Sequence, residues 1–118
     1  MADFKKLRVW RAAHGLALNA ERIAREIRGP GQSPLRNQLN RAAMSIPTNI
    51  VEGRGKKTDK DFARFLGYAL GSAIEFEYHV IAARDVGAIP KNDAVALLSQ
   101  VIEVRKMLHG LIDRLSGQ

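Results

Sequence analysis

The stretch SIPTNIVEGRG, from Ser45 to Gly55, carries a proline inside a helical hydrophobic pattern and ends in two closely spaced glycines. A proline within a helix removes a backbone hydrogen bond and costs about 3 kcal/mol or more. Something specific should offset that cost, and we predict a kink that aims Asn49, Glu52 and the basic turn that follows. The stretch therefore marks a turn between two helices and a first candidate site.

Apolar residues on both sides of this stretch recur at alternating spacings of three and four, which is typical of amphipathic helices. The first pattern begins at Trp10, and we expect its helix to end near Arg28 because a Gly-Pro-Gly sequence follows. The second helix is predicted to begin with Ser33 as N-cap and Pro34 as its first helical residue. It should stop at the two glycines of the opening stretch.

A third pattern opens at Thr58, the expected N-cap, and Gly87 is expected to cap its end. A fourth follows Pro90, with Asp93 placed near the positive end of the helix dipole. The expected core positions of the four helices are Trp10, Ala13, Ala17, Ala20, Ala24, Ile27, Leu35, Leu39, Ala42, Ile46, Ile50, Phe62, Leu66, Ala69, Ala73, Phe76, Val80, Ala83, Leu97, Val101, Val104, Leu108, Leu111 and Leu115.

Length and composition agree with one helical domain. A chain of 118 residues buries about two thirds of its surface on folding, which supports a single core. Aromatic residues make up 6%, no strand-like alternation is present, and the lack of cysteine excludes disulfides and thiolate chemistry. We therefore predict an all-α domain over residues 1–118, an antiparallel up-down four-helix bundle. No long apolar segment follows the N-terminus, so we expect a soluble, cytoplasmic protein without membrane association.

The chain is strongly basic, with 19 Lys and Arg against 12 Asp and Glu and a net charge of +7. Such a charge favours a polyanionic partner, although solubility alone is the alternative explanation. The cations concentrate in the turn after the opening stretch and at the start of the third helix, where backbone amides also favour phosphate. The candidate nucleic-acid-binding residues are Arg54, Lys56, Lys57, Lys60 and Arg64.

Two further features bear on this basic turn. Phe62 and Phe65 interleave with its cations as stacking residues would, but both fit the apolar stripe and are expected in the core. A second basic group, Arg22, Arg25 and Arg28, lies at the end of the first helix. It either complements the helix dipole or widens the phosphate-binding surface.

A polar series runs along the second helix beside its apolar stripe. It is either a solvated face or a hydrogen-bonded seam at a helix or subunit interface, and in the second case it reaches Glu75 or Glu77. Buried glutamates would have to pair with Arg41 or share protons. The candidate interface or polar-seam residues are Gln38, Arg41, Ser45, Asn49, Glu52 and Glu75.

Signatures of catalysis are missing. A di-iron bundle needs Glu-x-x-His, whereas His79 follows Glu75 by four residues and Glu77 by two. The basic turn lacks the first glycine, the Ser/Thr and the preceding strand of a phosphate-binding loop. The sequence shows no Ser-His-Asp arrangement, because no serine has a nearby sequence cue for a base. We assign no catalytic, metal or cofactor-binding residue and expect a non-enzymatic protein without a cofactor.

Three motifs together carry a family resemblance. They are Phe4-x-x-Leu7-x-Val9-Trp10, then Leu35-x-x-Gln38 with Arg41-Ala42 and Ser45-Ile46-Pro47-x-Asn49-Ile50-x-Glu52-Gly53, and Phe62-x-x-Phe65-Leu66-x-x-Ala69-x-Gly71-Ser72-x-x-Glu75. The chain resembles the four-helix-bundle proteins encoded within intervening sequences of bacterial 23S rRNA genes. The resemblance implies a ring-shaped homopentamer. Relatives include the accessory subunit of diversity-generating retroelements, which binds nucleic acid and a reverse transcriptase, while the function of most members is unknown.

The resulting hypothesis is a basic homo-oligomeric bundle that binds structured RNA or an RNA–DNA hybrid through phosphates. The alternative is a scaffold that docks a partner protein, with its charge serving solubility.

Overall fold

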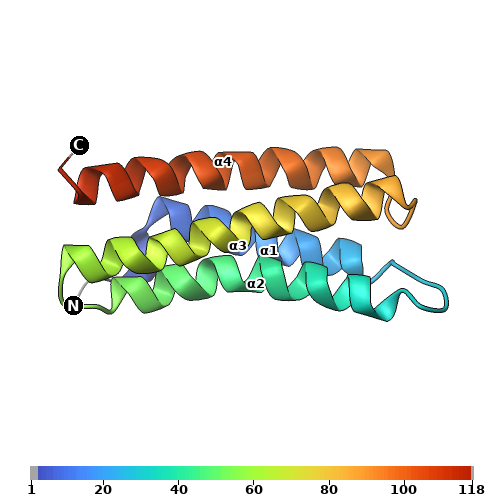
Figure 1. Cartoon of the computed structure of the whole chain (residues 1–118), viewed down its shortest axis with the longest axis horizontal. Coiled ribbons are helices and arrows are strands. Elements are labelled where there is room, and N and C mark those ends of the chain that lie inside the picture. The colour runs from blue at the N-terminus through green and yellow to red at the C-terminus, as the bar shows by residue number, and fades with distance from the viewer. Residues whose placement is uncertain (1–2, 118) are drawn as a thin grey trace.

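The structure is a computed structural model that describes residues 3–117. These residues form a short 3-10 helix, η1 (Phe4–Lys6), and the helices α1 (Arg8–Ala24), α2 (Ser33–Arg54), α3 (Asp59–Asp85) and α4 (Lys91–Leu115), with no strand among them. Figure 1 shows the chain turning back between successive helices, which lie along an elongated molecule of 46 × 22 × 19 Å. The predicted all-α class with four helices is confirmed.

The helices close around one core. α1 packs against α2 and α4, and α3 packs against the same two helices from the other side. The buried side chains are apolar, and within residues 3–117 no polar or charged side chain is buried. The predicted α3 stripe is buried in full, but four expected core residues near helix ends are only half-buried: Trp10, Leu35, Leu111 and Leu115.

Helix α1 ends at Ala24, four residues before the predicted position. The amides of Glu26 and Ile27 bond to the carbonyls of Ile23 and Ala24, three residues back, which tightens the chain into a turn. This turn buries Ile27, and Arg36 on α2 donates to the Ile27 carbonyl at 2.9 Å. Burial of one isoleucine thus ends the helix before the Gly-Pro-Gly sequence is reached.

The start of α2 also differs from the prediction, because its N-cap is Gln32 and Ser33 is already helical. The Ser33 hydroxyl accepts a bond from Arg36 Nη2 at 2.8 Å instead of capping a backbone amide. Farther along, α2 continues through the buried Pro47. Thr48 and Asn49 donate side-chain hydrogen bonds to carbonyls four residues back, at 2.8 and 2.9 Å, so polar side chains support the backbone around the proline.

The ends of α3 agree more closely with the sequence. Thr58 is the N-cap, and its hydroxyl accepts a bond from the Asp61 amide at 3.1 Å. At the other end Val86 is the cap and Gly87 follows with a φ of 78°, a conformation that glycine adopts without strain. The amides of Gly87 and Ala88 bond back to Arg84 and Ala83, which forms a Schellman motif.

None of the helices in residues 3–117 combines the length and the apolar content that a membrane crossing requires.

Packing is very close where α2 meets the start of α3. A Cβ on the buried Gly53 would stand 2.8 Å from Phe65 Cβ and 3.0 Å from Phe62 Cδ1. We therefore expect Gly53→Ala to lower the free energy of unfolding by about 1–3 kcal/mol through overpacking. Denaturant unfolding measures this change.

The matched control is Gly15→Ala in α1, where nothing lies within 4 Å of the added methyl group. Its helix propensity should raise stability by up to about 1 kcal/mol. Equal effects of the two substitutions would contradict the close contact at Gly53.

Candidate nucleic-acid interface

The α2–α3 turn, residues 54–60, places several cations at one end of the molecule. Helix α2 ends at Arg54, Gly55 follows as its cap, and α3 begins at Asp59 after the Thr58 N-cap. Gly53 lets the two helices approach closely, so the aromatic rings of Phe62 and Phe65 stand beside this turn. The local packing therefore sets aromatic faces next to basic side chains.

Three of the five predicted cations lie over these rings. The Arg54 guanidinium carbon is 5.5 Å from the Phe62 ring centre, and Lys56 Nζ is 4.9 Å from that of Phe65. Arg64 also lies over Phe65, at 5.0 Å. Each contact contributes about 0.5–1 kcal/mol at an exposed site. Aromatic faces therefore hold both Arg54 and Lys56.

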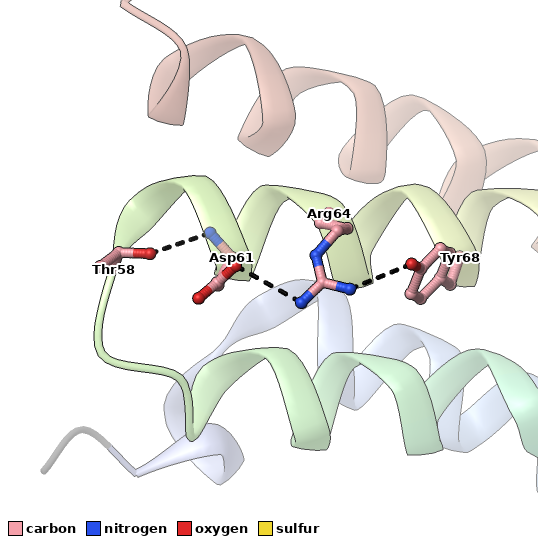
Figure 2. Close-up of polar contacts among 4 residues, drawn as sticks. All are labelled: Thr58, Asp61, Arg64 and Tyr68. Carbon is pink, nitrogen blue, oxygen red and sulfur yellow. Dashed lines mark hydrogen bonds and ion pairs between the residues drawn. The ribbon is translucent and has the colours of Figure 1, made fainter.

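Arg64 is held from both sides on the exposed face of α3, as Figure 2 shows. Its Nη1 donates to the Tyr68 hydroxyl at 3.1 Å, and its Nη2 lies 3.4 Å from Asp61 Oδ1. The bond to Tyr68 is the main cause that raises the pKa of this guanidinium above its ordinary value, and Asp61 acts in the same direction. Arg64 thus stays charged and is fixed in position.

The other two cations of the cluster, Lys57 and Lys60, are exposed. Within residues 3–117 neither lysine forms an ion pair. Both ammonium groups are therefore available to an anion from solution without loss of an intramolecular partner.

Sequence reasoning placed Phe62 correctly in the core but missed the role of its neighbour. Phe65 is only half-buried and carries two cations. Tyr68 is a further residue of this site: its ring packs edge-on against Phe65 at 5.2 Å, and its hydroxyl accepts a hydrogen bond from Arg64. The Arg64–Tyr68 spacing of four residues, which places both side chains on one helix face, was the available signal.

The second basic group does not extend this surface. Arg22, Arg25 and Arg28 lie at or beyond the end of α1, at the opposite end of the molecule from the α2–α3 turn (Figure 1). Arg22 donates to Asn19 at 2.6 Å, and Arg25 pairs with Glu21 at 2.5 Å. The hypothesis that these three arginines widen the phosphate-binding surface of the α2–α3 turn is therefore wrong.

The polar seam lies in a groove of about 330 Å³ between α2 and α3. Four of its predicted members line this groove: Gln38, Arg41, Ser45 and Glu75. Ser45 Oγ lies 2.6 Å from Ser72 Oγ on α3, and Asn49 Nδ2 donates to Ser45 Oγ at 3.2 Å. These groups are half-buried or exposed, so the seam is neither a fully solvated face nor a buried one.

The remaining expectations for the seam need correction. Glu52 is exposed and does not line the groove. Glu77 pairs with Arg105 on α4 at 2.6 Å, away from the seam. Glu75 lies 3.5 Å from His79, and within residues 3–117 Arg41 pairs with neither glutamate. Sequence reasoning missed His79 as a groove residue, although its spacing of four from Glu75 placed the two on one face.

Within residues 3–117 no three side chains of the types that bind metals are grouped to hold an ion. The seam groove contains a glutamate, a histidine and a serine, but the serine is 2.6 Å from another serine and is held by Asn49. The α2–α3 turn, with its excess of cations, is the stronger candidate for binding.

Comparisons with known proteins agree with this fold. A family model described as 23S rRNA-intervening sequence protein matches residues 5–110. A similar crystal structure is that of a protein with unknown function from the S23 ribosomal protein family of Bacteroides thetaiotaomicron. It has a TM-score of 0.82 and 22% sequence identity, and the alignment covers 88% of this chain and 97% of that one. Comparison with the curated proteins gives no match.

Proposed function

This chain belongs to the 23S rRNA-intervening sequence protein family, and we propose that it binds structured RNA or an RNA–DNA hybrid through phosphates, without catalysing a reaction. The observation that carries the proposal is the cluster at the α2–α3 turn. Its five cations are Arg54, Lys56, Lys57, Lys60 and Arg64. Three are held over aromatic rings, and two are exposed without ion pairs.

The geometry of the cluster favours phosphates over bases as ligands. Base stacking needs a free aromatic face, but both Lys56 and Arg64 lie over the Phe65 ring. The rings therefore serve as supports for cations. Arg64 is the most restricted of these cations because Tyr68 and Asp61 also hold it, so it loses little conformational freedom when an anion binds. Contacts of this kind position a nucleic acid without reading its sequence.

Charge reversal at the two free lysines tests the proposal. We expect Lys57→Glu with Lys60→Glu to weaken binding of an RNA hairpin and to flatten its salt dependence. The slope of log K against log salt should fall by about two units, because each phosphate contact contributes roughly 0.9. Filter binding at several salt concentrations measures both effects, and circular dichroism checks helicity.

The matched control reverses Arg22 and Arg28 at the opposite end, with the same change in net charge. It should leave the slope nearly unchanged. If both double variants bind the hairpin equally and with wild-type slope, the proposal is wrong. A wild-type protein that does not bind the hairpin at low salt would instead favour the alternative, a scaffold that docks a partner protein.

The second part of the proposal is assembly into a ring-shaped homopentamer, which the family resemblance implies. Exposed apolar side chains support it because they occur on two opposing sides of the bundle. The first group is Ile74 and Tyr78, which line a shallow groove between α3 and α4, with the exposed Ile102 on α4. The second group is Met44, which lines a groove between α1 and α2, with the exposed Leu18 on α1. In a ring, each copy contacts its two neighbours through two different surfaces, and the two apolar groups could supply these surfaces. The same exposed groups would serve docking of another protein.

Aspartate at Ile74 tests the ring. The side chain is 52% exposed, so Ile74→Asp should keep the helices folded while it removes apolar contact between copies. Burial of an isoleucine contributes about 1.5–3 kcal/mol, and a buried unpaired carboxylate costs more. We expect light scattering to show the particle mass falling toward the 13.0 kDa of one chain.

Val86→Asp is the control, because Val86 is 69% exposed in the turn that follows α3 and belongs to neither group. It should leave the mass unchanged. A wild-type particle of one chain at all micromolar concentrations would contradict assembly altogether.

A further inference from the structure

A second groove, of about 300 Å³, lies between the start of α1 and the second half of α4. Four cations line it: Lys6 from η1, Arg8 from α1, and Lys106 and Arg114 from α4. Figure 1 shows the start of α1 and the end of α4 at the same end of the molecule as the α2–α3 turn. Because η1 also packs against α2, this groove and the α2–α3 turn belong to the same end of the bundle. We call this feature the end groove.

The charge of the end groove is uncompensated. Its lining includes no carboxylate, and within residues 3–117 none of the four cations forms an ion pair. Four like charges around a concave site repel one another and raise the local concentration of anions. The groove therefore favours an anionic ligand.

The floor of the end groove is apolar. It is made by Leu7, Val9, Met107 and Leu111, of which Val9 is buried and the others are half-buried. Gly110 leaves space beside Arg114, since a Cβ on this glycine would stand 3.7 Å from Arg114 Nη1, an ordinary contact distance. A simple inorganic anion would use the cations but leave this floor exposed to water. A ligand with an anionic part and a flat apolar part would contact the cations and also cover the floor.

We infer that the end groove binds one nucleoside 5′-phosphate unit, with the phosphate on the cations and the base over the apolar floor. The inference rests on the proposed function, which brings RNA to the neighbouring α2–α3 turn. The volume is at the lower limit for ligand pockets and suits one nucleotide but not a helical partner segment. The Met107 thioether contacts heteroaromatic rings favourably, which favours a base over the aliphatic stem of an acidic peptide.

A steric block tests the groove without a change in charge. Gly110→Leu fills it from a helical position, and Gly15→Leu on the open face of α1 is the control. The probes are an RNA hairpin with a 5′-phosphorylated one-nucleotide adenine overhang and the same hairpin with an abasic overhang. Wild type and Gly15→Leu should bind the adenine form about tenfold more tightly, because the base removes the apolar floor from water. Gly110→Leu should bind both forms equally, at the affinity of wild type for the abasic form.

Free AMP, measured by calorimetry, distinguishes the source of the nucleotide. If wild type binds AMP and Gly110→Leu does not, the site is supported. If the overhang has no effect in the same experiment, the ligand is a free nucleotide and not part of an RNA. An overhang preference that persists in Gly110→Leu overturns the inference. The inference is also wrong if wild type shows neither AMP binding nor overhang preference. It is wrong as well if polyglutamate, but not AMP, competes with the adenine overhang for the groove.

The proposed function is scored separately by the abasic hairpin and the Lys57/Lys60 variant. If the Lys57/Lys60 variant loses hairpin binding while Gly110→Leu binds both hairpins as wild type does, the proposed function stands. The end-groove inference is then wrong. If wild type binds AMP in the groove but no hairpin, the proposed function is wrong while the groove site stands.

Discussion

The end of α2 and the start of α3 approach so closely that Gly53 has no room for a side chain. A methyl group there would stand 2.8 Å from Phe65 Cβ, closer than real contacts come, and 3.0 Å from Phe62 Cδ1, which is also a very tight contact. This constraint fixes the position of the α2–α3 turn against the α3 aromatics. The cations that follow Gly53 then fall over those aromatic faces, Arg54 over Phe62 and Lys56 over Phe65. A packing requirement of the backbone thus determines the arrangement of the basic cluster.

The stability of the bundle comes mainly from its apolar core, to which these charges add little. Within residues 3–117 the core is built from apolar side chains, and polar contacts between helices stay at its half-buried edge. One such contact crosses each of three helix pairs: Asn19 with Gln100, Ser45 with Ser72, and Glu77 with Arg105. Each is short and specific for one alignment of the two helices, so it fixes register more than it adds free energy. Surface lysines and arginines outside these contacts can therefore be replaced without loss of the fold.

Sequence periodicity was sufficient for the four helices and for the complete buried stripe of α3, because burial of one helix face imposes the spacing directly. It was insufficient where a single tertiary contact decided the outcome. Burial of Ile27 ended α1 at Ala24, and Arg36 engaged the Ser33 hydroxyl. At the candidate site the sequence identified the five cations, but the half-buried position of Phe65 and the participation of Tyr68 depend on how α2 and α3 pack. The place of Arg22 at the opposite end follows from chain direction in three dimensions.

The proposed ring and the proposed RNA surface use different parts of the molecule and reinforce each other through symmetry. The exposed apolar groups lie on the long sides of the bundle, whereas the α2–α3 turn and the end groove lie at one end. Cyclic symmetry keeps every copy in the same orientation relative to the ring axis. In a ring built through the long sides, the basic ends of all copies would therefore form one rim. The potential of such a rim adds across copies, while each copy keeps its own phosphate contacts. Binding at several subunits would raise the overall affinity for a long RNA without any new contact, because each contact after the first is intramolecular.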